Sequence, residues 1–232
     1  MLALLYDIHG NLPALQAVLE DSRGYDVEGW LLGGDMAPFG AWPAETVARL
    51  RELSDATWIR GNTERWLVDP LPPDEPMAAA VQACREALGD EVAEELGSLP
   101  EAARIDAYTV AWHGSPVSDM RSFMPEPTDD DAELLADVTD RRLVFGHTHL
   151  QFKRTAQGPE GDVELLNPGS VGIPLDGDHR AAWGLIAPDG SIELRRVAYD
   201  HAASAQALRD RYGDAEWVGI VAGRIERARL NA

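Results

Sequence analysis

Side chains able to bind a metal ion follow five separate apolar segments of this chain. They are Asp7 and His9, Asp35, Asn62, His113, and His147 with His149, and most stand beside a glycine. A single Asp or His at such a place usually caps a helix or serves the local structure, but five places in one chain are hard to explain that way. Carboxylates, an amide oxygen and imidazoles, with no thiolate, favour Mn, Fe, Co, Ni or Zn over Ca or Mg.

The number of these side chains indicates more than one ion. Seven residues are too many for a single ion and predict two, with one carboxylate bridging them. The pair His147 and His149 is separated by one residue. In an extended chain such residues point to the same side, so we expect both imidazoles to face the same centre.

The first third of the chain predicts an α/β arrangement that would bring these residues together. Apolar strands are expected at 1–7, 27–35 and 56–62, separated by amphipathic helices at 11–24 and 43–54. Asn11 can cap the first helix, and Pro13 suits its first turn. Strands alternating with helices predict a parallel or mixed sheet with helices on its faces, and ligands bind such sheets at the carboxyl ends of the strands.

The remaining elements are expected as follows. A helical excursion is predicted at 74–100, a hairpin at 103–116, a helix at 128–142 and a strand at 143–147, followed by short strands at 150–156, 162–170, 181–190 and 191–200. From His201 onward the chain is expected to be helical, notably at 203–213 and 219–230. We expect residues 1–232 to form one domain, with the excursion bordering the binding cleft.

Composition narrows the class of protein. The chain has 232 residues and a formal net charge of -20, so we expect no stable nucleic-acid binding and no membrane association. Cys84 is the only cysteine, which excludes an intrachain disulfide and predicts a small core residue. The short apolar start lacks the basic segment of a signal peptide, and we expect a cytoplasmic protein.

The order of the polar blocks resembles that of the calcineurin-like metallophosphoesterases. The family's blocks D-x-H, G-D, G-N, H and G-H-x-H appear here as Asp7-Ile8-His9, Gly34-Asp35, Gly61-Asn62, His113 and Gly146-His147-Thr148-His149. The segments "DIHGNLPAL" and "NPGSVGIPLDGDHRAAWGL" are similar to the small prokaryotic phosphodiesterase branch of that family. The resemblance extends from Asp7 to about Trp183 and is specific for the fold and the metal site rather than for the substrate.

This resemblance implies a four-layer αββα sandwich of two mixed sheets flanked by helices. One metal would take Asp7, His9 and His149, the other would take Asn62, His113 and His147, and Asp35 would bridge them. The implied cofactors are two divalent transition-metal ions, manganese first, with Fe, Ni, Co or Zn as alternatives. The implied reaction is hydrolysis of a small phosphodiester or nucleotide-like substrate by in-line attack of a metal-bridging hydroxide, with Asp35, Asn62 and His113 as the catalytic residues.

One departure from the family pattern bears on catalysis. Many relatives have a histidine directly after Gly-Asn, where it assists the leaving group, but this chain has Thr63. A threonine hydroxyl is no proton donor near pH 7, which predicts weak catalysis on poor leaving groups unless His179 or a metal-bound water substitutes. An alternative is that the protein is a metal-binding interaction scaffold with little activity, as one trafficking-coat relative is. Dinucleoside polyphosphates are a variant of the substrate class, and a homo-oligomer is possible.

A few further residues could contact the substrate. Arg60 could meet a phosphate at a strand end, or equally pair with one of the many acids. Asn11 could face the substrate, although helix capping alone explains it. Trp42 and Trp66 stand near the expected site loops, where either could line a pocket, whereas the tryptophans in apolar strands are expected in the core.

Overall fold

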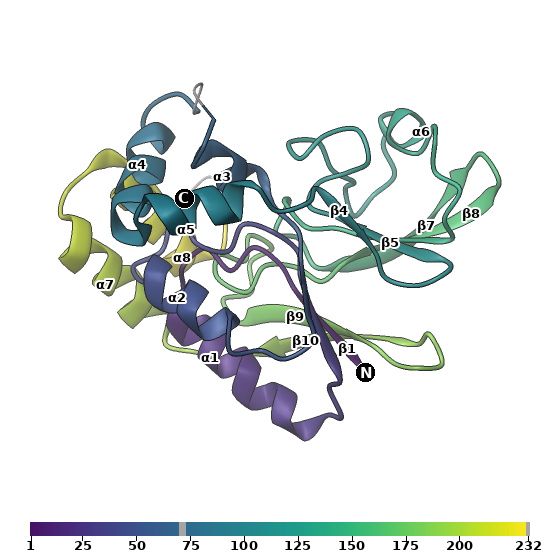
Figure 1. Ribbon diagram of the computed structural model, residues 1–232, viewed down its shortest axis with the longest axis horizontal. Helices are drawn as coiled ribbons and strands as arrows, with labels where there is room; N and C mark the ends of the chain where they lie inside the picture. Colours follow the sequence, from purple (N-terminus) through teal and green to yellow (C-terminus); the bar gives the residue numbers. More distant parts are fainter. Residues whose placement is uncertain (70–72, 231–232) are drawn as a thin grey trace.

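The computed structural model describes residues 1–69 and 73–230, and two mixed five-stranded sheets form its centre (Figure 1). The first sheet has the order β10-β9-β1-β2-β3. Its parallel strands are β1 (Leu2–Leu5), β2 (Gly29–Leu32) and β3 (Ala56–Trp58). Strand β9 (Ala181–Ile186) runs antiparallel to β1, and β10 (Ile192–Val197) runs antiparallel to β9.

The second sheet has the order β4-β5-β6-β8-β7. Strands β5 (Thr109–Trp112), β6 (Arg142–Val144) and β8 (Gly161–Asn167) are parallel. Strands β4 (Ala102–Arg104) and β7 (Phe152–Gly158) close its two edges in antiparallel pairing. The predicted hairpin is therefore confirmed as β4 and β5.

Apolar side chains from both sheets fill the space between them. This inner core consists of Leu4, Tyr6, Leu31, Ile59, Ala111, Val144, Leu166 and Ile186. Tyr6 spans the interface, since its hydroxyl donates a hydrogen bond of 3.3 Å to the carbonyl of Val144. Because both sheets bury this face, their polar strand ends are held at a fixed separation along one edge.

Helices cover the outer face of the first sheet. They are α1 (Leu12–Asp21), the short 3₁₀ helix η1 (Ser22–Gly24), α2 (Pro43–Leu50), α3 (Asn62–Trp66), α4 (Met77–Leu88) and α5 (Asp90–Gly97). Gly89, with φ of +79°, divides the predicted 74–100 excursion into α4 and α5. Cys84 is confirmed as a core residue.

The chain ends in a helical pair. Helices α7 (His201–Tyr212) and α8 (Glu216–Arg227) pack against one another, and α8 also contacts α4 (Figure 1). Their shared core contains Leu208, Trp217 and Val221. In the ranges 1–69 and 73–230, no helix combines the length and apolar character that crossing a bilayer requires.

The outer face of the second sheet differs from the prediction in detail. The helix expected at 128–142 is wrong beyond one turn, because the structure forms only α6 (Asp131–Leu134) there. Phe123, Leu135 and Val138 bury against the sheet from turns and loops, so no continuous helix is needed to cover it. β-branched Val138 and Thr139 also lower helix propensity at this point. The predicted fold class, two mixed sheets flanked by helices, is confirmed.

Candidate metal centre

The carboxyl ends of five parallel strands meet at one edge of the two sheets. Strand β1 leads to Asp7 and His9, β2 to Asp35, β3 to Asn62, β5 to His113, and β6 to His147 and His149. All of them are buried except His147, which is partly exposed. The structure thus brings together the seven side chains that the sequence singled out.

Most of these residues have strained backbone conformations. The φ angles of Asp7, His9, Asp35, His147 and His149 lie between 49° and 67°, in the left-handed region that residues with a side chain rarely adopt. Each such residue costs on the order of 1–3 kcal/mol, and this kind of strain is concentrated at functional sites. The expectation that His147 and His149 lie along an extended strand is therefore wrong, since a left-handed turn aims both of them.

The side chains form two groups with Asp35 between them. In the first, His149 Nε2 lies 3.5 Å from Asp7 Oδ1 and 3.1 Å from His9 Nε2. In the second, Asn62 Oδ1 lies 3.1 Å from His113 Nε2 and 3.0 Å from His147 Nδ1.

The Asp35 carboxylate faces both groups. Its Oδ2 lies 3.7 Å from His9 Nε2, and its Oδ1 lies 3.5 Å from His113 Nε2. Asp7 is also near both groups, because its Oδ1 lies 3.9 Å from His113 Nε2. The grouping matches the division of residues expected from the sequence, and the assignment of each residue to an ion stays a prediction.

The hydrogen bonds of the imidazoles indicate that their free ring nitrogens face a site for a cation. Nδ1 of His9, His113 and His149 lies 3.1, 2.9 and 2.6 Å from the carbonyl oxygens of Pro38, Gly33 and Ile173 respectively. A carbonyl only accepts, so each Nδ1 carries the proton and each Nε2 presents a lone pair. Two such lone pairs face one another at 3.1 Å between His9 and His149.

The carboxylates support the same interpretation. Asp7 has no exposed surface, and its Oδ1 has no hydrogen-bond partner within residues 1–69 and 73–230. A buried carboxylate oxygen without a donor is costly unless a cation compensates it. Asp7, His9 and His149 form one candidate metal-binding group, and Asp7, Asp35 and His113 form another. The residues present therefore fit divalent metal ions.

Burial sets the protonation states that metal binding needs. It lowers the pKa of His147 to about 4 and that of His149 to about 3, so both rings are neutral ligands at neutral pH. Burial also raises the pKa of Asp35 to about 6, although hydrogen bonds from Thr63 oppose the shift. Removing water thus disfavours charge on both residue types, and a bound cation offsets the cost for the carboxylates.

Two residues that follow Asn62 hold the loops around Asp35. The Glu64 carboxylate has no exposed surface and accepts hydrogen bonds from the backbone N–H groups of Asp35, Met36 and Gly61, at 2.7, 2.8 and 2.9 Å. Thr63 donates two hydrogen bonds to Asp35 Oδ1. This contact of Thr63 with Asp35 could not be predicted from the sequence, where Thr63 is notable only because it replaces a proton-donating histidine.

Glycines permit the close approach of backbone and ligand at two points. A Cβ added at Gly61 would lie 2.2 Å from Asp35 Oδ1, and one added at Gly146 would lie 2.6 Å from Asp7 Oδ2. Neither distance is possible without moving the carboxylate. These contacts explain why glycine precedes both Asn62 and His147.

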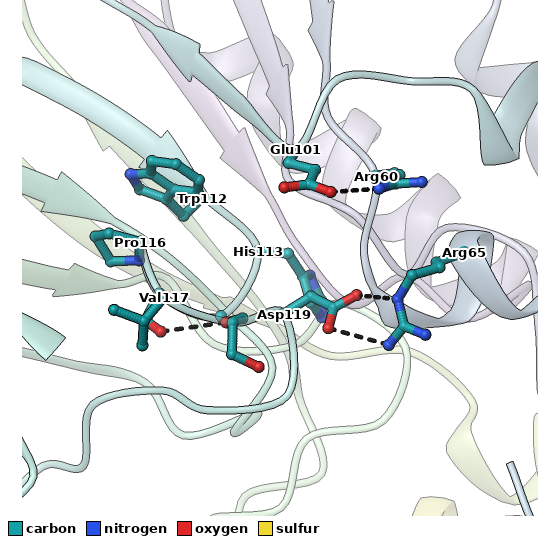
Figure 2. A pocket seen from close by; sticks show the side chains of 11 residues that line it. Arg60, Arg65, Glu101, Trp112, His113, Pro116, Val117 and Asp119 are labelled. Carbon is teal, nitrogen blue, oxygen red and sulfur yellow. Dashed lines mark hydrogen bonds and ion pairs between the residues drawn. The ribbon is translucent and has the colours of Figure 1, made fainter.

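The two tentative substrate residues already have protein partners. Arg60 pairs with Glu101 and donates a hydrogen bond of 3.1 Å to the carbonyl of Gly97, beside a hollow of about 270 Å³ (Figure 2). Asn11 is confirmed as the cap of α1, since its Oδ1 accepts from the N–H of Ala14. Contacts of Arg60 and Asn11 with substrate stay predictions.

A larger hollow, of about 680 Å³, opens beside the two groups of side chains. His9, Asp35, Asn62, His147 and His149 form its polar floor. Trp66 also lines it, whereas Trp42 packs in the α7–α8 core instead.

Residues from distant parts of the chain complete this hollow. Met77 lies at the start of α4, so the helical excursion borders the site as expected. Arg224 of α8 also lines the hollow, and the sequence analysis missed it because no motif marks this residue in the helical tail. The candidate acid His179 is not among the lining residues, and its ring stacks on that of His201.

Comparison with protein families gives a match over most of the chain. Residues 1–186 match the family described as the calcineurin-like phosphoesterase superfamily domain. MJ0912 from Methanocaldococcus jannaschii is 28% identical over 94% of this chain and 96% of its own length. The phosphodiesterase YfcE of Escherichia coli K12 is 26% identical over 82% of this chain and 89% of its own length.

Two solved structures are similar to this one over nearly the whole chain. A metallophosphoesterase from Sphaerobacter thermophilus superposes with a TM-score of 0.78 at 26% identity, covering 98% of each chain. The hypothetical protein PH1004 from Pyrococcus horikoshii OT3 superposes with a TM-score of 0.79 at 24% identity, covering 95% of this chain and 98% of its own. The second likeness shows a shared fold.

Proposed function

Because the chain belongs to the calcineurin-like phosphoesterase superfamily, we propose that it is a dinuclear metal-dependent phosphodiesterase forming a single domain over residues 1–232. It is a hydrolase of phosphoric ester bonds, with candidate ligand residues for divalent metal ions. The observation that carries the dinuclear proposal is the position of Asp35. Its two carboxylate oxygens face His9 and His113, which belong to different groups of candidate ligands. A carboxylate placed in this way is suited to bridge two ions.

The proposed ligand sets follow this geometry. Asp7, His9 and His149 would hold one ion, Asn62, His113 and His147 the other, with Asp35 shared. When bound, two divalent ions, manganese first and Fe, Ni, Co or Zn as alternatives, would activate water and neutralise the oxygens of the phosphate.

The protein itself contributes order and protonation. The buried imidazoles are neutral at working pH, and hydrogen bonds to backbone carbonyls fix the tautomers of His9, His113 and His149. Thr63 and Glu64 hold Asp35 and the loop of Asn62 in register. Such preorganisation reduces the rearrangement needed as charge develops on the phosphoryl group.

Two observations favour a diester with a good leaving group. YfcE is named a phosphodiesterase, and its match covers 82% of the present chain. Thr63 is fully buried and hydrogen-bonded to Asp35, so it does not serve as the proton donor for a leaving group. The proposed substrate is therefore a small phosphodiester or nucleotide-like molecule whose leaving oxygen needs little protonation.

The scaffold alternative has less support. A protein that kept only the fold would be expected to lose ligand residues, and all seven are present and adjacent here. The departure at Thr63 was the one feature that favoured the scaffold, and its contact with Asp35 gives it a place in a working centre.

The deciding experiment combines metal content with turnover. Metal bound to the purified protein is measured by mass spectrometry, and hydrolysis of bis(p-nitrophenyl) phosphate is followed with Mn²⁺ present. We expect about two ions per chain and measurable turnover. Stoichiometric metal with no turnover on a broad panel of esters would favour the scaffold, and no bound metal under any loading condition would overturn the proposal.

A further inference from the structure

Arg224 is a cation beside the candidate metal centre, and no carboxylate among the described residues pairs with it. It projects from α8 into the hollow that His9 and His149 also line. Within residues 1–69 and 73–230 it makes no ion pair, and its buried Nε has no hydrogen-bond partner. By contrast Arg121, which lines the same hollow, is held by Glu133 at 2.6 and 2.9 Å.

The electrostatic setting agrees with this geometry. Burial lowers the pKa of the Arg224 guanidinium, and no carboxylate opposes that shift. Burial is also the main cause that lowers the pKa of His9 and His149, and the charge of Arg224 lowers both further. The guanidinium therefore lies close to the first group of candidate ligands. Arg224 is half-buried, and a partly desolvated cation without an ion pair among residues 1–69 and 73–230 is suited to bind an anion that enters the hollow.

The walls around Arg224 are apolar. They include Phe39, Trp66, Met120, Met124, Ile173 and Leu230. Met120, Met124 and Leu230 expose 46%, 41% and 57% of their surface, so the apolar lining continues to the rim. Methionine side chains adapt to ligands of different shape, and a hollow of about 680 Å³ is of the size that binds small organic molecules.

From this juxtaposition we propose that Arg224 binds the anionic oxygens of the substrate phosphate, and that the apolar walls take an aryl-sized or larger organic group of the diester. This inference rests on the proposed function and names its substrate class. Arg224 lies beyond the family match, which ends at residue 186, so the selectivity would come from the helical tail rather than from the family's shared motifs. A guanidinium fork suits two phosphate oxygens at once.

The test pairs two substrates with two variants. Bis(p-nitrophenyl) phosphate and methyl p-nitrophenyl phosphate share a leaving group and differ only in the group that remains. Arg224→Met keeps the apolar stem and removes the charge, and it should raise KM for both diesters about 10- to 100-fold. Arg227→Met, on the exposed side of the same helix, is the matched control and should leave KM unchanged.

The apolar walls have their own prediction. Wild type should bind the bis-aryl diester at least about tenfold more tightly than the methyl diester, because the second ring buries apolar surface. Met124→Asn, at a wall residue that is partly exposed, should reduce this preference while leaving the affinity for the methyl diester within about threefold. Equal affinity of the wild-type protein for the two diesters would overturn the proposal that the apolar walls bind an organic group.

Two further readouts separate substrate binding from structure and from catalysis. Arg224→Met should unfold at the same temperature as wild type or higher, since a half-buried charge without an ion pair is removed, whereas a structural role would lower the unfolding temperature. The affinity for benzylphosphonate, measured by calorimetry, should weaken about 10- to 100-fold in Arg224→Met even if no ester is hydrolysed. The role of Arg224 and the phosphodiesterase activity are therefore tested independently. Unchanged binding of benzylphosphonate in Arg224→Met would overturn the role of Arg224. Arg224→Lys keeps the charge, so it should retain part of the affinity for benzylphosphonate that Arg224→Met loses.

Discussion

The Thr63 hydroxyl donates a hydrogen bond of 2.9 Å to Oδ1 of Asp35, and the Thr63 backbone N–H donates another of 3.0 Å to the same oxygen. Both residues are buried. That oxygen also faces His113, so Thr63 fixes the direction in which the Asp35 carboxylate meets the second group of candidate ligands. A position where many relatives carry a histidine thus has a different role here, which is to orient Asp35.

Replacing Thr63 by valine should therefore weaken metal binding. Thr63→Val keeps the side-chain shape and removes the hydroxyl donor, and loss of such a supporting contact typically weakens metal affinity about 10- to 100-fold. Thr63→Ser, which keeps the hydroxyl, should stay within about threefold of wild type. Calorimetric titration with Mn²⁺ measures both. A Thr63→Val protein that binds Mn²⁺ as wild type does would contradict the positioning role.

Removing the charge of Asp35 should separate the two ions. Asp35→Asn keeps the shape but lacks the second anionic oxygen, so we expect bound metal to fall from about two ions per chain to about one or less. Hydrolysis of bis(p-nitrophenyl) phosphate should fall by at least about 100-fold. Asp55→Asn, at an exposed aspartate, should change neither quantity. Retention of both ions in Asp35→Asn would exclude a bridging role for this carboxylate.

The framework of the site could be predicted because its signals are local. Apolar strands ending in polar residues beside glycine are visible in the sequence, and parallel strands necessarily bring such ends to one edge. The capping contact of Asn11 follows from the same kind of local pattern. These signals sufficed for most of the strands and for gathering the residues from Asp7 to His149, whereas the division of the strands into two sheets was implied by the family resemblance.

The features that escaped prediction depend on tertiary contacts. Thr63 and Asp35 are 28 positions apart, and Arg224 reaches the hollow from a helix that no motif distinguishes from an ordinary amphipathic tail. The left-handed φ angles of His147 and His149 arise from the turn that the surrounding fold imposes. The predicted helix at 128–142 failed for the same reason, since burial against the second sheet decided its conformation.

The two histidines of the GHTH turn should each control a different ion. His149 lies against Asp7 and His9, and His147 lies against Asn62. Each single alanine variant should therefore retain about one ion per chain. Combining His147→Ala with Asn62→Ala, within one group, should still leave one ion, whereas combining it with His149→Ala should leave none. Mass spectrometry of the desalted proteins decides, and loss of both ions in either single variant would contradict the division.

Glu64 should matter for stability as well as for the site. Its carboxylate accepts from three backbone N–H groups on two loops. In Glu64→Gln the amide nitrogen would face at least one of these donors, so a buried N–H loses its acceptor at a cost of about 1–3 kcal/mol. Denaturant unfolding of the metal-free protein measures this loss. Glu52→Gln, at a side chain that is 66% exposed, is the control and should cost less than about 0.5 kcal/mol.

Burial raises the pKa of both Asp7 and Asp35, so proton release on metal binding should come from these carboxylates rather than from the imidazoles of the GHTH turn, and the part that changes near pH 6 should come from Asp35. Its pKa is raised to about 6 by burial, so below pH 6 the metal-free protein holds a proton there that a cation must displace. The pKa values of His147 and His149, lowered by burial to about 4 and about 3, leave both rings already neutral between pH 5.5 and 7.5.

The pH dependence of proton release follows from these pKa values. Release should be largest near pH 5.5 and should decline as the pH rises through about 6, because Asp35 is then already ionised. Calorimetry with Mn²⁺ in buffers of different ionisation enthalpy measures the number of protons released. Asp35→Asn should remove this pH-dependent part, while Asp178→Asn, at a carboxylate whose pKa Arg180 lowers to about 2, should not. If His149→Ala abolished the release instead, the proton would belong to an imidazole, and the assignment to Asp35 would be wrong.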